Sequence, residues 1–304
     1  MNNYKYTSIF NNSADKKLSI FERIYWIFIN ILNNSFPNFN IDKNLIIQKY
    51  KNKKNNILFK KIDSKSSPAR ILCDIFWISF PWNKILFYNN ERKIKFLEIG
   101  AGKGVYANLL NDLILNDLEF YTGVDINFQK EWESFDKKKF KFYKDTSDNI
   151  LNYINDNNVL FTQSAIEHFE NDLLFFKKIS KYLEETNKNI LQIHLFPSTE
   201  CLSTYLWHGY RQYSPRNISK ITKLFDERYN KILFKLGSAN SNYIHKKFIT
   251  YPKIFQKKDL RFKKNQEYIS EFLLSLKDTG KIQISFYALI ISSKNGYNLN
   301  LSDF

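Results

Sequence analysis

The sequence predicts an α/β protein built on a mostly parallel sheet with helices on both faces. From residue 94 onward, short apolar runs of strand length alternate with longer segments whose apolar residues recur at helical spacing. The 304 residues are 43% hydrophobic and include only 8 Gly and 6 Pro, which excludes a disordered or fibrous chain. Strands that alternate with helices in this way lie parallel, and the helices between them cover the two faces of the sheet.

Seven apolar segments of strand length follow residue 90. The expected strands cover residues 94–99, 119–126, 140–145, 159–162, 190–196, 231–236 and 281–291. The expected helices between them cover residues 106–115, 147–155, 167–185 and 215–229. Residues 238–280 are Lys-rich, irregular and partly helical. We therefore expect an α/β domain over residues 91–292 with an insertion at about 238–280, followed by a frayed tail over residues 293–304.

Residues 1–90 are expected to form a separate helical region that caps this domain. Two segments, residues 18–36 and 70–88, carry apolar side chains at helical spacing. The uninterrupted apolar run from Ile24 to Ile29 is too short to span a membrane, which takes about 20 residues. We favour packing of these helices on a neighbouring domain or a second subunit, and the alternative is peripheral contact with a membrane surface.

The net charge of +16 suggests a nucleic-acid partner, but the kind of basic residue argues against one. Only 7 of the 46 basic residues are Arg, and the Lys residues are spread along the whole chain. Proteins that bind phosphates favour Arg because its planar guanidinium pairs bidentately with oxyanions. We interpret the charge as a solvated surface and do not expect nucleic acid as a partner. Two cysteines and an N-terminus without a signal-peptide pattern are typical of an intracellular, cytoplasmic protein.

Three glycines lie within five residues between the first expected strand and the first expected helix. The segment reads Glu98-Ile-Gly-Ala-Gly-Lys-Gly104. A chain that turns this sharply needs residues without a Cβ, both for positive φ and for a ligand to approach the backbone. The spacing differs from the Gly-x-Gly-x-x-Gly of pyrophosphate-binding turns. Glu98 is expected to point into the site, where a carboxylate would repel a pyrophosphate and favour a cationic, amine-bearing ligand.

Polar residues end or follow the next strands at the same edge of the expected sheet. Asp125 ends the second strand, where a carboxylate can accept hydrogen bonds from both hydroxyls of a ribose. Asp145 ends the third strand, where it could accept a hydrogen bond from an adenine amino group; starting a turn before a capped helix is an equally good interpretation. Gln163, Ser164 and the pair Glu167-His168 follow the fourth strand, at the edge where open α/β sheets bind ligands.

The segments LEIGAGKG, GVDIN and VLFTQSAIEHF, in this order and spacing, resemble three motifs of class I S-adenosylmethionine (SAM)-dependent methyltransferases. The resemblance covers roughly residues 91–292 and implies a Rossmann-like doubly wound sheet whose last strand is antiparallel. It implies SAM as the cofactor, with the glycine turn around the methionine portion, Asp125 on the ribose, Asp145 near the adenine and Gln163 near the sulfonium. The residues expected to contact SAM are Glu98, Gly100, Ala101, Gly102, Gly104, Asp125, Ile126, Asp145 and Gln163.

The segment after the fifth expected strand carries aromatic and hydrogen-bonding side chains, where this fold usually builds its acceptor pocket. We expect Trp207, Tyr210, Arg211 and Tyr213 to bind the acceptor, since flat aromatic faces beside hydrogen-bond donors suit a sugar. A packed loop with buried aromatic rings is the alternative. Together with residues 67–77 and 241–252, this segment also resembles methyltransferases associated with bacterial surface-polysaccharide synthesis, which implies a glycan or another small-molecule acceptor.

A general base is expected, because a sugar hydroxyl is a poor nucleophile at neutral pH. His208, on the acceptor-side segment, is the first candidate, and His168, after the fourth strand, is the second. His194 lies in an expected strand and is interpreted as a histidine of the core. We see no cluster of His, Asp and Glu with the spacing of metal ligands, so no metal site is assigned. The alternative that stays open is a Mg²⁺ ion held by acceptor-side carboxylates such as Glu200.

The sequence thus favours a SAM-dependent O-methyltransferase that acts on a sugar, within a glycan or linked to a lipid or nucleotide. Two alternatives stay open: a methyltransferase that modifies RNA, and a SAM-binding scaffold protein without catalysis. The residues at 163–166 read Gln-Ser-Ala-Ile instead of the Asn/Asp-Pro-Pro-Tyr/Phe tetrad typical of amino-group methyltransferases, which argues against RNA bases as acceptors. The oligomeric state is not predicted.

Overall fold

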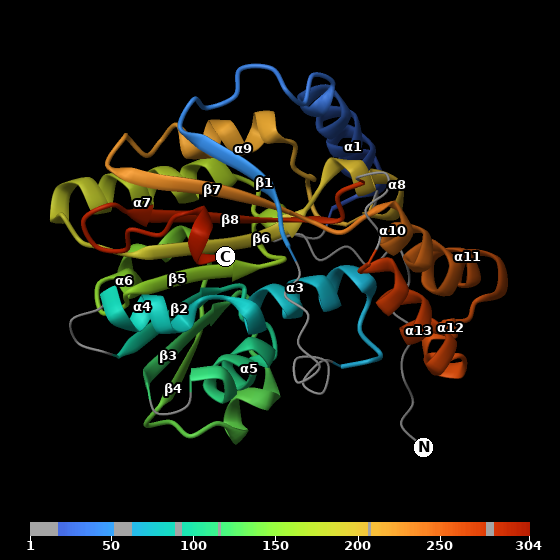
Figure 1. The fold of residues 1–304 in the computed structure, drawn as a ribbon, viewed down its shortest axis with the longest axis horizontal. Helices are drawn as coiled ribbons and strands as arrows, with labels where there is room; N and C mark the ends of the chain where they lie inside the picture. Colours follow the sequence, from blue (N-terminus) through green and yellow to red (C-terminus); the bar gives the residue numbers. More distant parts are fainter. Residues whose placement is uncertain (1–17, 52–62, 89–92, 115–116, 206–207, 278–282) are drawn as a thin grey trace.

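An eight-stranded sheet organises the residues that the structure, a computed structural model, describes: 18–51, 63–88, 93–114, 117–205, 208–277 and 283–304 (Figure 1). The strand order is β1-β7-β8-β6-β5-β2-β3-β4, and β8 runs antiparallel to both of its neighbours while the other pairs are parallel. The strands are β1 (Leu45–Lys49), β2 (Ile94–Ile99), β3 (Leu118–Asp125), β4 (Phe140–Lys144), β5 (Val159–Gln163), β6 (Leu191–Pro197), β7 (Tyr229–Leu236) and β8 (Phe286–Ser293). The predicted class is confirmed, with one strand more than expected.

Helices cover both faces of this sheet. On one face, α3, α4 and α5 pack in the same apolar cluster as the sheet residues, and on the other face α6, α7 and α9 do so. Figure 1 shows α3 crossing in front of the strands and α10 to α13 gathered at one end of the molecule. The helices are α1 (Ile20–Asn34), α3 (Pro68–Ser79), α4 (Trp82–Tyr88), α5 (Val105–Ile114), α6 (Leu151–Ile154), α7 (Asp172–Thr186), α8 (Leu202–Tyr205), α9 (Pro215–Thr222), α10 (Ala239–His245), α11 (Tyr251–Gln256), α12 (Leu260–Lys263) and α13 (Asn265–Ser275).

The alternation of side chains along β2 decides which residues face which helices. Successive side chains of a strand point to opposite faces. Phe96 belongs to the apolar cluster under α3 and α5, whereas Leu97 and Ile99 belong to the cluster under α6 and α7. By the same alternation, Glu98 faces the layer of α3 and α5.

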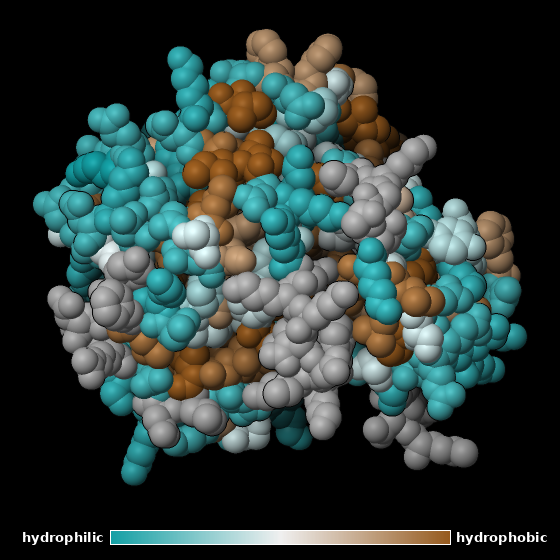
Figure 2. Space-filling model, in the orientation of Figure 1, coloured by the Kyte–Doolittle hydropathy of each residue, from teal (hydrophilic) through white to brown (hydrophobic). Residues whose placement is uncertain are grey.

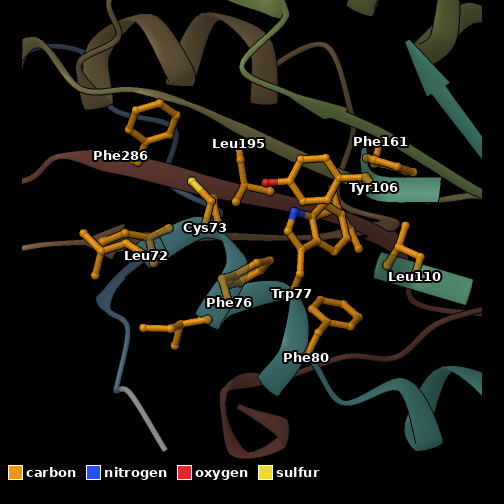
Figure 3. Packing of buried hydrophobic residues seen from close by; sticks show 14 of the residues in the cluster. Leu72, Cys73, Phe76, Trp77, Phe80, Tyr106, Leu110, Phe161, Leu195 and Phe286 are labelled. Atoms are coloured by element: carbon orange, nitrogen blue, oxygen red, sulfur yellow. The ribbon is translucent and has the colours of Figure 1, made fainter. Parts of the chain in front are cut away.

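Residues 18–88 supply parts of the sheet and of its core. Strand β1 pairs in parallel with β7, with Leu45 opposite Lys231. Helix α3 buries most of its length, and Figure 3 shows Trp77 from α3 close to Tyr106 from α5 and Phe161 from β5. The helix expected over residues 70–88 is divided at Phe80, which is extended because proline follows it.

Helix α1 exposes its apolar side. It begins at a capping box in which Ser19 and Glu22 satisfy each other's backbone N–H groups. Phe21, Tyr25 and Phe28 recur at helical spacing and are exposed, Phe21 to 80%. Figure 2 shows hydrophobic residues over this helix. Among the residues that the structure describes, none covers this face, and no described helix is long and apolar enough to cross a membrane.

The two C-terminal segments are more ordered than expected. The described part of the insertion is largely helical, with α10 to α13 and one π-helical turn over Lys246–Thr250. The tail was expected to fray, but Tyr297 and Leu299 are buried, and the ring of Phe304 contacts those of Phe80 and Phe234. Apolar side chains in this otherwise polar tail explain why it packs on the core.

Candidate active site

A cavity of about 270 Å³ opens at the carboxyl ends of β2, β3 and β5. This is the edge at which open α/β sheets bind ligands, and the volume is close to the lower limit of about 300 Å³ for small-molecule pockets. The lining residues are Ile99, Gly100, Val124, Asp125, Ile126, Asn127, Gln129, Asp145, Ser147, Ser164, Ala165, His168 and Phe169.

The glycine turn between β2 and α5 forms one wall of this cavity. Gly100, Gly102 and Gly104 all have positive φ, at 83°, 49° and 76°. The N–H groups of Gly100 and Ala101 donate to the carbonyl of Val124, which ties the turn to the end of β3. A Cβ at Gly100 would lie 2.4 Å from the Cβ of Ala165, so the turn approaches the segment after β5 as closely as glycine permits.

Asp125 fastens the turn to the end of β3. Its Oδ2 accepts the N–H of Gly102 at 2.9 Å, and its Oδ1 accepts the N–H of Asn127 at 2.9 Å. Each carboxylate oxygen has a second lone-pair direction, so both can still accept a hydroxyl from a ligand. The carboxylate lies on the cavity wall beside Ile126.

Asp145 lines the cavity next to Asp125 and already has partners of its own. Its oxygens accept the N–H of Thr146, the amide of Asn149 and the hydroxyl of Tyr153. The hydroxyl of Tyr153, first among these, holds the pKa of Asp145 below its usual range. Asp145 therefore stays ionised near neutral pH and also organises the turn after β4.

The charge on the cavity wall is opposite to that of the chain as a whole. Asp125 and Asp145 are the charged carboxylates of the lining, and no described Lys or Arg lines it. The chain carries a net charge of +16. An acidic cavity on a basic protein favours a ligand with positive charge and disfavours a pyrophosphate.

Glu98 does not point into the cavity, in contrast to the expectation. It is buried on the α3 and α5 face of the sheet, and the hydroxyl of Tyr121 donates to it. Burial raises the pKa of Glu98 well above its usual value, an effect that the charge of Arg70 on α3 opposes. The reason is the alternation along β2, which turns Ile99 toward the cavity and Glu98 away from it.

The structure also places other expected cofactor residues behind the wall. Ala101, Gly102 and Gly104 shape the turn without lining the cavity. Gln163 is buried, and its Oε1 accepts the indole N–H of Trp77 at 2.9 Å. Its neighbour Ser164 lines the cavity with a φ of 51°, which is unusual for a residue other than glycine.

Glu167, His168 and His208 meet at one end of the cavity. Glu167 and His168 lie in a 3₁₀ turn, η4 (Ile166–His168), and His208 lies in the segment after α8. The Nε2 atoms of His168 and His208 are each 3.9 Å from Oε1 of Glu167, and the two imidazole rings contact edge to face. His168 lines the cavity, whereas Glu167 and His208 do not.

Burial keeps all three groups close to neutral when no ion is bound. It lowers the pKa of His168 to about 3, with a smaller contribution from His208, and lowers that of His208 to about 4. Burial raises the pKa of Glu167 to about 8. One ligand atom from each side chain lies within 4.8 Å of the others, so the cluster could hold a metal ion, which the sequence did not predict.

The segment 209–213 holds His208 beside His168. The N–H of Tyr210 donates to the carbonyl of Glu167 at 2.8 Å, and the hydroxyl of Tyr213 donates to the carbonyl of Ile166 at 3.1 Å. The guanidinium of Arg211 donates to the carbonyls of Phe169 and Glu170. These bonds join two segments that lie about forty residues apart in the sequence.

Of the residues expected to bind the acceptor, those that the structure describes do not line the cavity beside the glycine turn. Tyr210 and Tyr213 are buried, and together with Arg211 they line a second, smaller cavity of about 150 Å³ that Trp26 and Asn30 of α1 close. Arg211 also forms an ion pair with Asp172. Trp207 lies outside the described residues. His194 is a core histidine as interpreted, and its Nδ1 lies 3.0 Å from Oγ1 of Thr162.

Sequence reasoning did not assign Ala165 or Phe169 to the site, and it placed Glu167 at the ligand-binding edge of the sheet without giving it a role. Ala165 and Phe169 carry no polar group that would single them out. Glu167 precedes a candidate base, and its adjacency to His168 was the available signal. Its contact with His208 depends on a long-range approach that spacing along the chain does not reveal.

No protein-family model matches the chain, and no curated protein matches it. Several solved structures do match it. The plantazolicin methyltransferase BpumL in complex with SAH is 11% identical, with 90% of this chain and 98% of that chain covered and a TM-score of 0.48. The plantazolicin methyltransferase BamL, in complex with a triazolic desmethylPZN analog and SAH, is 12% identical, with 89% and 97% covered and a TM-score of 0.47. A SAM-dependent methyltransferase from Archaeoglobus fulgidus is 15% identical. The match covers 79% of this chain and 100% of that chain, with a TM-score of 0.43. Because the identities and scores are this low, function is inferred from the site.

Proposed function

We propose that this protein is a SAM-dependent methyltransferase. The observation that carries the proposal is the acidic cavity beside the glycine turn, where Asp125 and Asp145 line neighbouring strand ends without a described Lys or Arg. Asp125 would hold the ribose hydroxyls, Asp145 would face the adenine amino group, and Gly100 would let the ligand approach the backbone. When bound, the sulfonium supplies an activated methyl group.

We place the acceptor hydroxyl at the end of the cavity that His168 lines. In the metal-free protein, His168 is the candidate base because it lines the cavity, and the imidazole of His208 contacts its ring; both imidazoles are neutral near pH 7. The surrounding 3₁₀ turn and the segment 209–213 hold both rings, so they need little reorganisation during the reaction.

We further propose an O-methyltransferase with a sugar as acceptor. Gln163-Ser164-Ala165-Ile166, in place of the amino-group tetrad, supports an oxygen acceptor over a base amine. The smaller cavity, lined by Trp26, Arg211 and the amide of Asn30, offers the mixture of aromatic and hydrogen-bonding groups that suits a sugar.

The proposal is tested by binding and by turnover. Asp125→Ala should weaken SAM binding by about 1.5–3 kcal/mol, because it removes charge-assisted hydrogen bonds to the ribose. Calorimetric titration with SAM measures this, with Asp156→Ala, an exposed carboxylate away from the site, as the control. Wild-type affinity in Asp125→Ala would overturn the assigned site.

Transfer of a labelled methyl group from SAM to sugars, nucleotide sugars and mixed RNA then identifies the acceptor class. A labelled sugar supports the proposal, and labelled RNA would replace the sugar with RNA. SAM binding without any labelled product from cell extract supports the scaffold alternative.

A further inference from the structure

We infer that Glu167, His168 and His208 form a binding site for one divalent first-row transition-metal ion. The geometry of the site stands by itself, and its catalytic meaning rests on the proposed function.

The three ligand atoms are close enough to bind one ion. All lie within 4.8 Å of one another, and Oε1 of Glu167 is 3.9 Å from each Nε2. Bonds of about 2.0–2.2 Å from a metal to nitrogen and oxygen allow ligand atoms to lie up to about 4 Å apart. Side-chain movements of less than about 1 Å would therefore close the site around an ion.

Glu167 lacks the compensation that a buried carboxylate needs. Its side chain is 0% exposed, and neither carboxylate oxygen has a hydrogen-bond partner among the described residues. Other buried carboxylates of this chain have one: Asp42 pairs with Lys231, and Glu98 accepts the hydroxyl of Tyr121. Ionising a buried carboxyl group without a partner costs several kcal/mol, and a cation between Glu167 and the two imidazoles would offset this cost.

Backbone contacts hold His208 close to Glu167 and His168. Gly209 has a φ of 67°, and a Cβ there would lie 2.6 Å from the carbonyl oxygen of Glu167. The segment therefore approaches the 3₁₀ turn as closely as glycine permits, and the N–H of Tyr210 fixes it by its bond to the same carbonyl. Because these contacts involve the backbone, the cluster does not depend on flexible side chains alone.

The kinds of donor indicate the class of ion. Two imidazole nitrogens and one carboxylate oxygen suit zinc, iron, cobalt or manganese, whereas magnesium and calcium prefer oxygen ligands only. Three protein ligands leave coordination positions free for a substrate.

The position of the cluster gives such an ion a use in the proposed reaction. His168 lines the cavity, so the ion would lie at the end where we place the acceptor hydroxyl. A Lewis acid at this place would bind an acceptor oxygen and favour loss of its proton to water. Proton transfer to histidine is then confined to the metal-free protein, because a nitrogen that binds a metal has no lone pair left.

Metal binding to the whole protein tests this inference. The purified chain is stripped with a chelator, dialysed and titrated with Zn²⁺, Co²⁺ or Mg²⁺ by calorimetry, and Co²⁺ binding is followed by its visible absorption. We expect one equivalent of Zn²⁺ or Co²⁺ and weaker binding of Mg²⁺. Glu167→Gln and His208→Asn should each weaken Co²⁺ binding at least about tenfold. The controls are Glu170→Gln, an exposed carboxylate three residues away, and His245→Asn in α10, both of which should bind as wild type does.

Absence of a stoichiometric ion would overturn the inference, as would unchanged binding in Glu167→Gln or His208→Asn. Mg²⁺ binding tighter than Zn²⁺ binding would overturn the class of ion. Circular dichroism and thermal unfolding of each variant show whether it is folded. SAM is titrated in parallel into the stripped protein to separate the two proposals. If SAM binds but no metal ion does, this inference alone is overturned. If a metal ion binds but SAM does not, the proposed function alone is overturned.

Discussion

Gly100 carries the tightest steric constraint of the glycine turn. A Cβ at this position would lie 2.4 Å from that of Ala165, whereas a Cβ at Gly102 would meet no atom within 4 Å. Both residues have positive φ. The two glycines, alike in the sequence motif, therefore differ in what they do: Gly100 brings two segments together at the cavity, and Gly102 turns the chain and donates its N–H to Asp125.

Gly100→Ala should be more damaging than Gly102→Ala. Both substitutions incur left-handed backbone strain of about 1–2 kcal/mol, but Gly100→Ala adds an overpacking cost of about 1–3 kcal/mol. Denaturant unfolding measures the stabilities, and calorimetry measures SAM binding, which Gly100→Ala should impair more. The double variant Gly100→Ala/Ala165→Gly should recover the overpacking part. Equal stability of the two single variants would contradict this account.

The sequence predicted the cavity residues that lie at strand ends. It did not predict which way a side chain points or which residues far apart in the sequence are in contact. The structure places Gly100, Asp125, Ile126 and Asp145 on the cavity wall, because strand ends can be read from apolar runs. Glu98 faces the other way, since one step along a strand reverses the face. Glu167 could not be placed beside His208, because their contact depends on the backbone of the segment after α8.

Helix α3 connects the described N-terminal residues to the site. Trp77 is buried between α5 and the sheet, and its indole N–H holds Gln163 at the end of β5. One turn earlier, Asp74 accepts the hydroxyl of Tyr106 on α5 at 2.8 Å. Burial raises the pKa of Asp74 to about 6, although the hydroxyl of Tyr106 and the charge of Arg70 oppose this effect.

The folded state should therefore lose stability as Asp74 ionises, because burial disfavours the carboxylate more than the hydroxyl of Tyr106 and the charge of Arg70 favour it. A pKa raised from 3.8 to about 6 means that the stabilisation is present below pH 3.8 and is lost as the pH rises through about 6. Asp74→Asn should remove about 3 kcal/mol of this pH dependence. Urea unfolding between pH 4 and 7 measures the slope, with the exposed Asp156→Asn as the control. An unchanged slope in Asp74→Asn would show that Asp74 does not titrate in this range.

Strands within the regular alternation of strands and helices could be predicted, and a strand outside it could not. The expected strand over residues 94–99 coincides with β2, and those expected over residues 140–145 and 159–162 differ from β4 and β5 by one residue. Strand β1 is five residues long and ends in Gln48-Lys49, so its sequence gives little signal apart from its partner β7. The helix expected over residues 215–229 ends at Thr222, because Asp226 and Arg228 form a turn before β7.

The charge of the cavity is opposite in sign to the net charge of the chain. The chain carries a net charge of +16, while the cavity at the strand ends is acidic. The eight strands form one sheet, and β1 and the C-terminal tail both contribute to it or to its core. We therefore expect the described chain to fold as one cooperative unit.

A chain that starts at residue 91 should not fold stably. It lacks β1, which pairs with β7, and α3, whose side chains fill the core on one face of the sheet. Circular dichroism during heating should show a cooperative transition for the full chain and none for the truncated one. A truncated chain that unfolds cooperatively at the same temperature would show that residues 1–90 form a separate region.

The central claim is that the acidic cavity beside the glycine turn binds a positively charged sulfonium compound. Equilibrium binding of SAM and of NAD to the full-length protein, measured by calorimetry under the same conditions, tests it most directly. We expect SAM to bind with one-to-one stoichiometry and NAD, whose pyrophosphate the two carboxylates repel, to bind at least about tenfold more weakly. NAD binding as tight as SAM binding, or no binding of SAM, would contradict it.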